Sequence, residues 1–350
     1  MDPLKIDTVK LSDAGDALVI IDQTLLPNEV RYLSLTAIED IWEAIRALRV
    51  RGAPAIGVAA AFGAYLAAHY APDAELEGRF LAACDYLATS RPTAVNLFWA
   101  LDRMRAAYGR VKALPPSDIR AALRAEAQAV MDEDIEISRS IGRYGLSLLR
   151  PGMGILTHCN AGTLATAKYG TALAPVYAAI ERGLPGLRVY CDETRPLLQG
   201  ARLSAFEMVS AGVDTTLLCD NMASSLMKSG KVDIIFVGCD RVARNGDAAN
   251  KIGTSGVAIL AAHYGIPFYV CAPSSTIDGA IASGADIPIE FRPPEEVTEL
   301  WYEKRMAPEG VGVYNPAFDV TDAGLITGII TERGLVRAPF EEGFRALGLV

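Results

Sequence analysis

Histidine is scarce in this sequence, with 3 among 350 residues, and the 6 cysteines lack the spacing of a metal site. The cysteines, none of which forms a CxxC pair, are Cys84, Cys159, Cys191, Cys219, Cys239 and Cys271. Structural zinc sites need closely spaced cysteines and histidines, so the sequence offers no such ligand set. Four of the six cysteines end apolar, strand-like runs, which favours reduced thiols over disulfides. We therefore expect no metal and no cofactor, and activity that survives exhaustive chelation.

The sequence also has fewer basic residues than acidic ones. Lysine and arginine total 33 against 42 aspartates and glutamates, which gives a formal net charge of -9. That field repels the phosphates of nucleic acids and of anionic lipid surfaces, and no local basic patch offsets it. We therefore expect neither nucleic-acid nor membrane partners. A small anion can still bind through a few arginine, lysine and backbone N–H groups.

Neither a secretory signal nor a membrane span is expected. The amino-terminal sequence MDPLKIDTVK has no apolar region after a basic start, so the cytoplasm is the default location. The charge-free stretch from Gly52 to Pro72 is about as long as a membrane span. Alanine and glycine dominate it, however, and these residues contribute little hydrophobic transfer energy. We expect a buried core helix there.

The chain does have enough apolar residues for a large core, since 51% are hydrophobic and 350 residues suggest two or three domains. Apolar residues alternate or run together in ALVIIDQTLLP (17–27) and EVRYLSL (29–35), which predicts a small antiparallel strand unit. Three- and four-residue apolar spacing then predicts helices over 38–48, 55–70, 75–88 and 95–108. The same spacing continues for roughly thirty residues from Ser117, long enough for a helix that connects two domains. Residues 1–150 are therefore predicted to form a mainly helical domain with a small sheet.

After Pro151 the sequence alternates short apolar strands with helical segments, the signature of βαβ units. The expected strands are 154–158, 187–191, 215–219, 234–239 and 267–271. We therefore predict an α/β fold in which residues 151–350 form a Rossmann-like, doubly wound parallel sheet. Each strand ends in a polar loop, and ligands bind beyond the carboxyl ends of the strands in such sheets.

The stretch VDIIFVGCDRVARNGDAANKIGTSG, from Val232 to Gly256, is the most informative of these strand–loop boundaries. A near-continuous apolar run, as expected of a strand buried on both faces, ends directly before Asp240. The following loop is crowded with asparagine, glycine, aspartate and lysine, including Asn250 and Lys251. A lone aspartate after a strand more often caps the next helix. The crowded loop favours a ligand-binding role for Asp240 instead.

A second informative stretch, GILTHCNAGTLATAKYG, runs from Gly154 to Gly170 as strand, loop and helix. Cys159 falls at the junction, where a helix starting near Gly162 would direct its N-terminal N–H groups at the sulfur and favour the thiolate. The alternative is a buried structural cysteine, which we expect for the other five. His158 is adjacent, but neighbouring side chains of a strand point to opposite faces. A Cys–His pair made of these two residues is therefore not expected.

Cationic groups precede two of the predicted helices. Arg51 lies in RVRGAPAIG, where Gly52 and Ala53 at a helix start leave backbone N–H groups open to an anion. Arg91 lies in TSRPTAVNL, again just before a helix. On residue type alone, a solvated surface arginine is the commoner outcome for each.

Seven motifs together resemble methylthioribose-1-phosphate isomerase over nearly the whole chain. They are RGAPAIG (51–57), RPTAVNL (91–97), THCNAGTLAT (157–166), DETRPLLQGARLSAFE (192–207), GCDRVARNGDAANKIGT (238–254), APSSTID (272–278) and IPIEFRPPEEV (287–297). That family converts an aldose 1-phosphate to a ketose 1-phosphate in methionine salvage. It shares its fold with the regulatory subunits of the guanine-nucleotide-exchange initiation factor. The sequence departs from the family pattern at Cys239, where alanine is usual, and at Ser255, where tyrosine is common.

Carried over motif by motif, the resemblance implies Cys159 and Asp240 as the catalytic pair, in a catalytic carboxyl-terminal domain. It implies substrate and phosphate contacts for Arg51, Gly52, Ala53, Arg91, Gln199, Asn250 and Lys251. The partner is then a small sugar phosphate, and no cofactor is implied. A homodimer is also expected.

The implied reaction needs an acid and a way to move hydrogen from C2 to C1, because phosphate on the anomeric oxygen blocks ordinary ring opening. In our interpretation desolvation keeps Asp240 protonated, so that it can protonate the ring oxygen, while the Cys159 thiolate takes the C2 proton. A hydride shift is the alternative. The sequence leaves open which of the two residues is acid and which is base.

Three competing functions share much of this pattern. Two are isomerases of 5-deoxyribose 1-phosphate or of ribose 1,5-bisphosphate, and the bisphosphate would need a second cationic cluster that the motif loops lack. The third is a non-catalytic regulatory subunit, against which the presence of both Cys159 and Asp240 argues.

Overall fold

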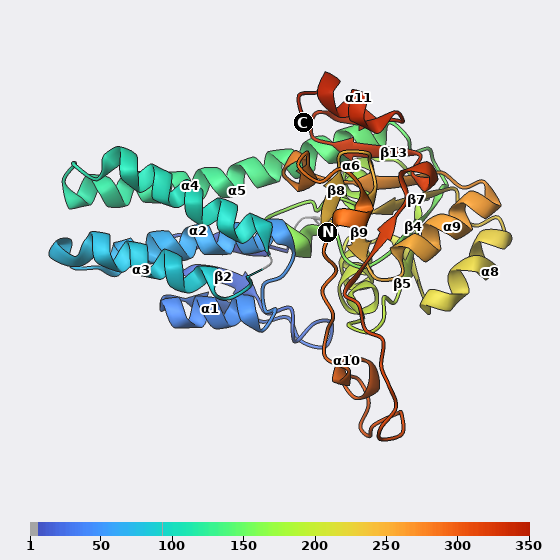
Figure 1. Ribbon diagram of the computed structural model, residues 1–350, viewed down its shortest axis with the longest axis horizontal. Coiled ribbons are helices and arrows are strands. Elements are labelled where there is room, and N and C mark those ends of the chain that lie inside the picture. The colour runs from blue at the N-terminus through green and yellow to red at the C-terminus, as the bar shows by residue number, and fades with distance from the viewer. Residues whose placement is uncertain (1–5, 93) are drawn as a thin grey trace. The chain divides into compact units, whose positions relative to one another are not determined.

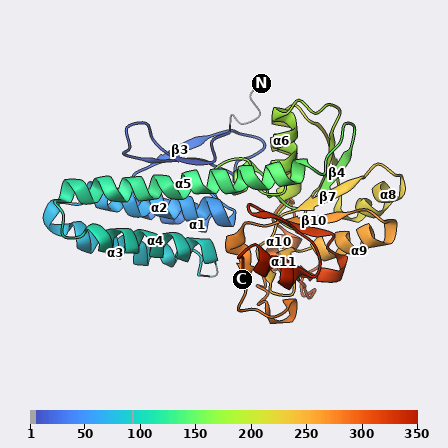
Figure 2. The ribbon, with the colours of Figure 1, turned by 90° about the horizontal axis from the view of Figure 1, so that it is seen from above.

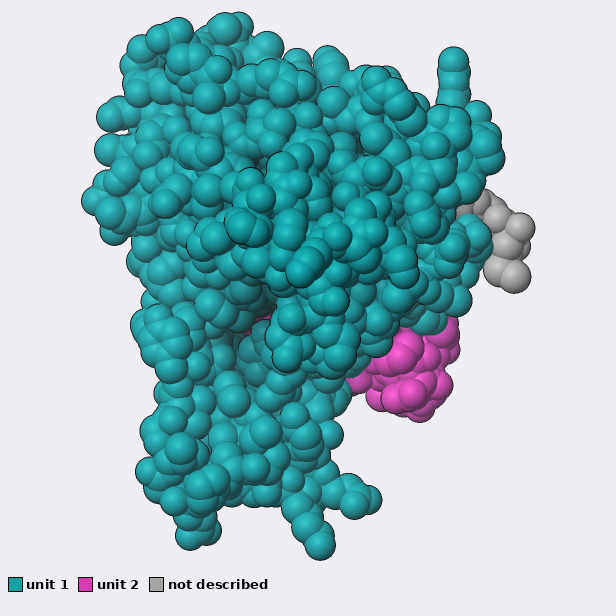
Figure 3. Space-filling view, turned by 90° about the vertical axis from the view of Figure 1, so that its right-hand side faces the viewer, with its two compact units in different colours: residues 1, 139–161, 171–350 teal, residues 2–138, 162–170 magenta. Residues whose placement is uncertain are grey.

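The computed structural model describes residues 6–92 and 94–350 and divides the chain into two compact units, coloured separately in Figure 3. Unit 1 comprises residues 139–161 and 171–350, and unit 2 comprises residues up to 138 together with 162–170. The division lies inside helix α5 (Pro116–Leu146), which runs as one continuous helix in Figure 2. The sequence predicts a boundary at residue 150 instead. It gives no sign that the short segment 162–170 belongs with unit 2.

Unit 2 contains the small antiparallel sheet that the sequence predicts. Its strands are β1 (Val9–Leu11), β2 (Leu18–Ile21) and β3 (Tyr32–Leu35), paired in that order. The central strand β2 is almost wholly buried, whereas β3 alternates exposed and half-buried residues. This is the pattern of an antiparallel sheet that faces the core on one side.

The five helices predicted from apolar spacing are all present. Their bounds are α1 (Ile38–Arg46), α2 (Ala53–Tyr70), α3 (Leu76–Ala88), α4 (Val95–Val111) and α5. A single 3-10 turn, η1 (Asp73–Glu75), leads into α3. The helical prediction for the amino-terminal part of the chain is therefore confirmed.

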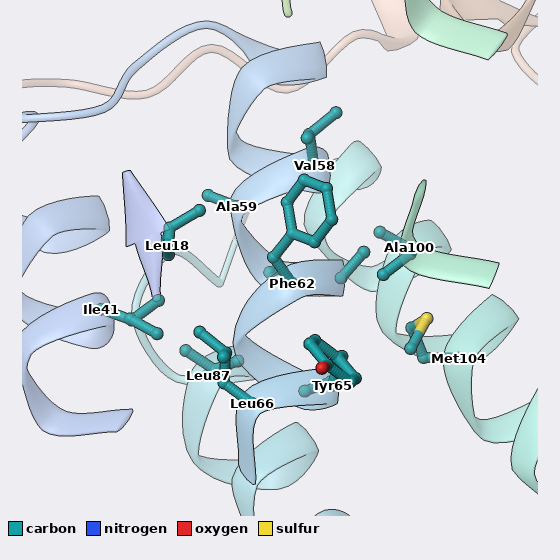
Figure 4. Close-up of a cluster of buried hydrophobic side chains, with 14 of the residues drawn as sticks. Leu18, Ile41, Val58, Ala59, Phe62, Tyr65, Leu66, Leu87, Ala100 and Met104 are labelled. Atoms are coloured by element: carbon teal, nitrogen blue, oxygen red, sulfur yellow. The ribbon is translucent and has the colours of Figure 1, made fainter. Parts of the chain in front are cut away.

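Helix α2 forms the centre of the unit 2 core. It packs against β2, α1, α3 and α4, and Figure 4 shows Phe62 and Leu66 of α2 among Leu18, Ile41 and Met104. A helix that is apolar all round is buried rather than amphipathic, so the prediction of a core helix in the charge-free stretch is confirmed. Among the described residues, no helix combines the length and the apolar character that crossing a bilayer requires.

Unit 1 is built on a seven-stranded sheet. Its strands are β4 (Gly154–Thr157), β5 (Arg188–Asp192), β6 (Asp214–Leu218), β7 (Ile234–Val237), β10 (Phe268–Cys271), β13 (Gly328–Thr331) and β14 (Gly334–Val336). Their order is β14-β13-β10-β7-β4-β5-β6, and every pair is parallel except β13 with β14. All five predicted strands lie in this sheet, of which Figure 1 labels β4, β5, β7 and β13, so the predicted Rossmann-like fold is confirmed. Strands β13 and β14 are not among the strands expected from the sequence.

The strand order reverses between β4 and β7, which are neighbours in the sheet. From β4 the chain adds β5 and β6 toward one edge, and from β7 it adds β10 and β13 toward the other. Ile155 of β4 lies opposite Ile234 of β7 in parallel register. Loops leave the two strands in opposite directions at such a switch point, which opens a crevice for ligands at the carboxyl edge. Cys159 follows β4, and Asp240 follows β7.

Short helical elements surround the sheet of unit 1. The α-helices are α6 (Ala174–Glu181), α7 (Ala205–Ser210), α8 (Ala223–Lys228), α9 (Thr254–Tyr264), α10 (Glu295–Thr298) and α11 (Phe340–Ala346). Shorter turns are the π-helix η3 (Gly200–Ser204) and the 3-10 turns η4 (Asp220–Met222), η5 (Ser274–Thr276), η6 (Gly284–Asp286) and η7 (Ala323–Leu325).

A second sheet replaces the long polar loop that the sequence predicts after Asp240. Its strands are β8 (Arg241–Ala243), β9 (Ala248–Lys251), β11 (Ile277–Asp278) and β12 (Phe318–Thr321), in the order β11-β8-β9-β12. Strands β8 and β9 form an antiparallel hairpin, in which Gly246 has a φ of 94° and donates its N–H to the Ala243 carbonyl oxygen. An Asn-Gly pair is a strong hairpin signal. The sequence carries that signal at Asn245 and Gly246, and the prediction of a plain loop overlooks it.

Candidate active site

Cys159 lies just beyond β4 in a buried and strained backbone conformation. The residue is 9% exposed, and its φ of 66° falls in the left-handed region that non-glycine residues seldom adopt. Its backbone N–H donates to Oγ1 of Thr194 (2.8 Å), and its carbonyl oxygen accepts from Oγ of Ser204 (2.7 Å). Both hydroxyl groups belong to the segment 192–207. The motif in that segment gives no hint by itself that it holds the Cys159 loop.

No α-helix begins near Gly162, so the predicted helix N-terminus beside the Cys159 sulfur is wrong. The chain there makes only a three-residue 3-10 helix, η2 (Thr163–Ala165), and α6 starts at Ala174. Any activation of the Cys159 thiol must therefore come from groups other than the N–H groups of a following α-helix.

The reason for the missing helix lies in unit 2, to which residues 162–170 belong. The carbonyl oxygen of Thr163 accepts from Oγ1 of Thr8 (2.6 Å), and the carbonyl oxygen of Leu164 accepts from Nε2 of Gln23 (2.8 Å). An α-helix would pair these carbonyl groups with its own N–H groups. Side chains distant in sequence take them instead, and local spacing cannot reveal such partners.

The two neighbours of Cys159 are each anchored by a buried carboxylate from the same segment. His158 Nδ1 lies 3.1 Å from Oδ2 of Asp192. Asn160 Nδ2 donates to Oε1 of Glu207 (2.9 Å). All four side chains are buried, so these bonds form away from water. The Cys159 loop is thereby fixed by side chains on both sides of the thiol.

His158 forms hydrogen bonds at both ring nitrogens, since Nε2 also lies 2.8 Å from the carbonyl oxygen of Ile252. Burial alone lowers the pKa of His158, but the hydrogen bond and charge of Asp192, together with the charge of Asp220 and the hydrogen bond to Ile252, outweigh burial, and the pKa is raised. Burial likewise raises the pKa of Asp192. Because both nitrogens face oxygen atoms of other segments, the geometry supports the expectation that His158 does not pair with the Cys159 thiol.

Asp240 follows β7 and, unlike Cys159, is exposed. Exposure contradicts the expectation that apolar surroundings desolvate this carboxyl group. The backbone N–H of Asp240 donates to the Ala249 carbonyl oxygen (2.9 Å). Asp240 therefore lies at the start of the β8–β9 hairpin and not within the main seven-stranded sheet. The exits of β7 and β4 still lie close together, because a Cβ on Gly238 would come within 2.5 Å of the Cβ of Ala161.

Cys239, one of the departures from the family pattern, behaves as a structural thiol. Its Sγ donates to the carbonyl oxygens of Arg241 (3.0 Å) and Ala249 (3.3 Å). Burial raises the pKa of Cys239 well above its usual value, and burial also raises the pKa values of Cys191 and Cys271. Such thiols are poor nucleophiles. All six cysteines of the chain are thiols rather than disulfides, as expected, but Cys219 is exposed, so the expectation of a buried structural cysteine is wrong at that position.

Asn250 and Lys251 lie on β9 rather than in a loop. The Asn250 side chain is 6% exposed and donates to Oγ1 of Thr254 (3.0 Å) at the start of α9. The Lys251 amine donates to the Ala317 carbonyl oxygen (3.0 Å) and lies 4.2 Å from the centre of the Phe318 ring. Pairing of β9 with both β8 and β12 gives these two side chains a more fixed position than a loop would.

Gln199 occupies the turn that leads from β5 into the π-helix η3. It is 6% exposed, and its Oε1 has no hydrogen-bond partner among the described residues. Buried acceptors are rarely left unpaired, so this oxygen suits a donor from a ligand. The next residue must be glycine, because a Cβ on Gly200 would come within 1.6 Å of the Asp192 carbonyl oxygen.

The cationic candidates belong to unit 2. Arg51 and Gly52 directly precede α2, whose first residue is Ala53, and Arg91 precedes α4. These four residues are all half-buried. Gly52 has a φ of 91°, and a Cβ there would come within 2.5 Å of the Ala165 Cα. Close packing and backbone conformation therefore already require glycine at position 52.

The two arginine motifs meet inside unit 2. A Cβ on Gly57, in the first turns of α2, would lie 3.0 Å from the carbonyl oxygen of Asn96 in the first turn of α4. The starts of α2 and α4 are therefore in contact, which the sequence spacing of the motifs does not indicate. Thr93, part of the second motif, lies outside the described residues.

The nine predicted site residues thus fall into two sets. The set in unit 1 is Cys159, Gln199, Asp240, Asn250 and Lys251. The set in unit 2 is Arg51, Gly52, Ala53 and Arg91. The unit 1 set lies on segments that follow β4, β5 and β7, the central strands of the main sheet. The roles of both sets in binding a substrate stay predictions.

One group of potential metal ligands among the described residues has its ligand atoms within 4.8 Å of one another, namely His158, Asp192 and Asp220. Oδ2 of Asp192 faces His158, whereas Oδ1 of Asp192 has no hydrogen-bond partner among the described residues. Oδ1 and Oδ2 of Asp220 accept from the backbone N–H groups of Thr194 (2.7 Å) and Arg195 (2.7 Å). We interpret the group as a hydrogen-bonded cluster, and the expected absence of a metal stays a prediction for chelation to test.

Comparison with known proteins gives matches over nearly the whole chain. The model of the Initiation factor 2 subunit family matches residues 49–338. A methylthioribose-1-phosphate isomerase of Symbiobacterium thermophilum is 66% identical over 348 residues, which cover 99% of this chain and 97% of the relative. A 5-deoxyribose 1-phosphate isomerase of Petrotoga mobilis is 57% identical over 342 residues, which cover 97% of this chain and 98% of the relative.

A solved structure agrees with these relatives. The crystal structure of 5-methylthioribose 1-phosphate isomerase from Pyrococcus horikoshii OT3 matches with a TM-score of 0.94 at 44% identity, covering 99% of this chain and 97% of that one. The prediction of an isomerase that acts on a sugar 1-phosphate is thereby confirmed. The chain belongs to the methylthioribose-1-phosphate isomerase family, within the initiation factor 2 subunit family.

Proposed function

We propose that this chain converts 5-methylthioribose 1-phosphate to 5-methylthioribulose 1-phosphate, with Cys159 and Asp240 as its catalytic pair. The observation that carries the proposal is the position of these two residues. Each follows one of the adjacent strands, β4 and β7, between which the strand order reverses. Ligands bind at that point of a doubly wound sheet. The names of the relatives support the reaction type.

The reaction needs an acid before it needs a base. Phosphate on the anomeric oxygen prevents ring opening through a free hemiacetal, so the bond from C1 to the ring oxygen must break as that oxygen is protonated. Removal of the C2 proton then gives an enol phosphate, and a proton returned to C1, with loss of the proton on the C2 hydroxyl, gives the ketose 1-phosphate. In a hydride shift, the C2 hydrogen moves to C1 with its electron pair while the C2 hydroxyl loses a proton.

The surroundings of the two residues suit different parts of this reaction. Asp240 is exposed, so it can regain a proton from water after each turnover. Cys159 is buried, so a proton taken from C2 would be sheltered there until it is delivered to C1. Turnover in heavy water tests the proton-transfer route. Deuterium at C1 of the product shows proton transfer, whereas product without deuterium at C1 fits both a hydride shift and a proton that Cys159 returns before it exchanges with water.

Groups near the switch point support a sugar phosphate as the ligand. The buried Oε1 of Gln199 suits a substrate hydroxyl. The Lys251 amine has three donors, of which one is used on the Ala317 carbonyl oxygen, so it can also bind a phosphate. Arg51 and Arg91 in unit 2 are the further phosphate contacts that we propose from their motifs.

The substrate is tested by turnover of purified protein on three sugar phosphates side by side, with EDTA present in a parallel series. We expect the highest kcat/KM for 5-methylthioribose 1-phosphate and no loss in EDTA. A higher kcat/KM for 5-deoxyribose 1-phosphate would favour the function named for the Petrotoga mobilis relative. Preference for ribose 1,5-bisphosphate would require a second cationic cluster. A loss in EDTA that one divalent ion restores would overturn the metal-free mechanism.

A non-catalytic regulatory subunit is the second candidate, since the matching family model is that of initiation factor subunits. Retention of Cys159 and Asp240 argues against it. Protein that binds none of the three sugar phosphates and turns none of them over would support this candidate. The expected homodimer is also a proposal, and light scattering on the purified chain tests it.

A further inference from the structure

The buried pair formed by His158 and Asp192 has no part in the proposed chemistry, although it adjoins Cys159. His158 is 1% exposed and Asp192 is 0% exposed. An ionisable pair this deep is costly to desolvate unless it is well hydrogen-bonded. A buried pair next to a catalytic candidate therefore calls for a specific role.

The hydrogen bonds of His158 determine where its protons lie. The partner of Nε2 is the carbonyl oxygen of Ile252, which can only accept, so Nε2 carries a hydrogen. The partner of Nδ1 is the carboxylate oxygen Oδ2 of Asp192 at 3.1 Å. The other charged groups that act on the pair are Asp220, whose Oδ1 lies 4.0 Å from Nδ1, and Glu193. All are acidic, which favours a doubly protonated, cationic imidazole.

The imidazole joins three of the site motifs within unit 1. His158 directly precedes Cys159, and Ile252 directly follows Lys251. Asp192 ends β5 and begins the segment that supplies Thr194 to the Cys159 backbone. Movement of the ring would therefore disturb the Cys159 loop and the end of β9 together.

The loop after Lys251 is shaped to admit this ring. Gly253 has a φ of 103°, and a Cβ there would come within 2.8 Å of Cε1 of His158. A side chain at position 253 would thus displace the imidazole or strain the loop. The close approach shows that the ring and the loop are fitted to each other, beyond the single hydrogen bond to Ile252.

We propose that His158 and Asp192 form a positioning unit for the isomerase site. In this unit a doubly protonated imidazole keeps the Cys159 loop and the end of β9, at Asn250 and Lys251, in fixed positions relative to each other. The proposal rests on the proposed function, because it acts through the catalytic candidate Cys159. His158 itself exchanges no proton with substrate. Its contribution is the placement of two loops that leave different strands.

Three variants test the positioning unit kinetically. His158→Gln keeps one amide donor for the Ile252 carbonyl but leaves the Asp192 carboxylate buried without its cation. We expect kcat to fall about 10 to 100-fold, the order of loss that a small misplacement causes, with a several-fold rise in KM through the Lys251 strand end. Asp192→Asn removes the charge while its amide can still donate to Nδ1, so its loss should be smaller.

The double variant His158→Gln with Asp192→Asn rebuilds an uncharged, hydrogen-bonded pair. It should recover part of the kcat that His158→Gln loses, since coupled residues are non-additive. Matched controls are His263→Gln on α9 and Asp214→Asn on β6, both exposed and outside the site, which should leave kcat and KM unchanged. Wild-type kcat and KM in folded His158→Gln, or simple additivity in the double variant, would overturn the positioning role.

A readout independent of turnover keeps this proposal separate from the proposed function. The chain has 3 histidines, so nitrogen NMR of the imidazole groups can be assigned to His158 by its loss in His158→Gln. We expect both ring nitrogens of wild-type His158 to be protonated at pH 7, and only one in Asp192→Asn. A neutral His158 in the wild type would overturn the proposal even if the enzyme is active. Wild-type protein that turns over no sugar phosphate would refute the proposed function instead.

Discussion

The Cys159 loop and the Asp240 turn leave neighbouring parallel strands of one sheet, yet they are built in opposite ways. Cys159 is buried, has a left-handed backbone and is held by Thr194 and Ser204 of a distant segment. Asp240 is exposed and belongs to a local hairpin, where its N–H pairs with Ala249.

The difference shows that one switch point can present two catalytic candidates with very different tolerance to change. The Cys159 loop depends on side chains more than thirty positions away along the chain, so substitutions in the segment 192–207 should disturb it. The Asp240 turn depends on hairpin pairing, which backbone groups supply whatever the side chains are. Four predictions test this contrast, beginning with the largest expected effect.

Cys159→Ser should have the largest effect. Serine keeps the shape but does not ionise near neutral pH, so kcat should fall about 10² to 10⁴-fold or more while substrate binding persists. The matched control is Cys271→Ser, a buried thiol at the end of β10 in the same sheet, which should lower the thermal midpoint and spare kcat. Both are measured by kcat and thermal midpoint beside wild type. A folded Cys159→Ser protein with near-normal turnover would end the catalytic assignment.

Asp240→Asn should have the next largest effect. We expect kcat to fall about 10²-fold, at the lower end of the usual range for a positioned acid, because water can partly replace an exposed acid. Asp233→Asn is the matched control, since Asp233 precedes the same strand and accepts the Gly154 N–H (2.7 Å), a bond that asparagine can keep. The comparison is made by kcat at saturating substrate. Equal losses in the two variants would mean that strand stability, and not acid catalysis, is at stake.

Lys251→Ala and Arg51→Ala should change binding more than turnover. A charge-assisted contact to phosphate acts in ground and transition states alike, so KM should rise about 10 to 100-fold with kcat little changed. Lys228→Ala at the end of α8 is a matched control that should leave KM unchanged, since Lys228 is exposed and outside the site. Steady-state kinetics on the three proteins provide the measurement. A wild-type KM in Lys251→Ala and Arg51→Ala would remove both residues from the phosphate site.

Asp134→Asn should have the smallest effect, seen only as a function of pH. Burial raises the pKa of Asp134 to about 7 from 3.8, although its carboxylate accepts the Ala167 N–H (2.6 Å). Between these values the folded protein binds a proton that the unfolded chain has lost, so stability falls as pH rises through this window. Asparagine keeps the acceptor and does not ionise.

We therefore expect the thermal midpoint to fall less between pH 5 and pH 8 in Asp134→Asn than in wild type. The falls in thermal midpoint of the two proteins should differ by roughly 2 to 4 °C for each kcal/mol of destabilisation that the substitution removes. Parallel melting curves at the two pH values provide the measurement. Identical pH dependence in the two proteins would show that Asp134 does not titrate in this range. The result bears on the contrast because Asp134 tethers the segment 162–170, which continues directly from the Cys159 loop.

Regular periodicity made most of the fold predictable. The helices α1 to α5 follow from apolar spacing, and the five strands β4, β5, β6, β7 and β10 follow from short apolar runs that end in polar loops. Cys159 and Asp240 stand out in the sequence because they follow such runs. Placement at the ends of strands is local information, and the sequence contains it directly.

The features that could not be predicted depend on distant partners. Nothing near Gly162 shows that the carbonyl groups after it are taken by Thr8 and Gln23, so the sequence suggested a helix there. The exposure of Asp240 depends on a hairpin that begins at that residue. The anchoring of His158 by Asp192 joins positions 34 residues apart. The hairpin is the exception, since its Asn245-Gly246 turn was visible in the sequence.

The excursion of residues 162–170 limits how modular this protein can be. The described chain passes between the units three times, after residues 138, 161 and 170, rather than once as in proteins whose domains follow one another. No single cut or fusion point can therefore yield two complete units. A gene fragment that ends at residue 138 would leave unit 2 without residues 162–170, whereas a fragment that starts at residue 139 would contain all of the described part of unit 1. A single recombination point in the gene therefore cannot exchange unit 2 as a whole.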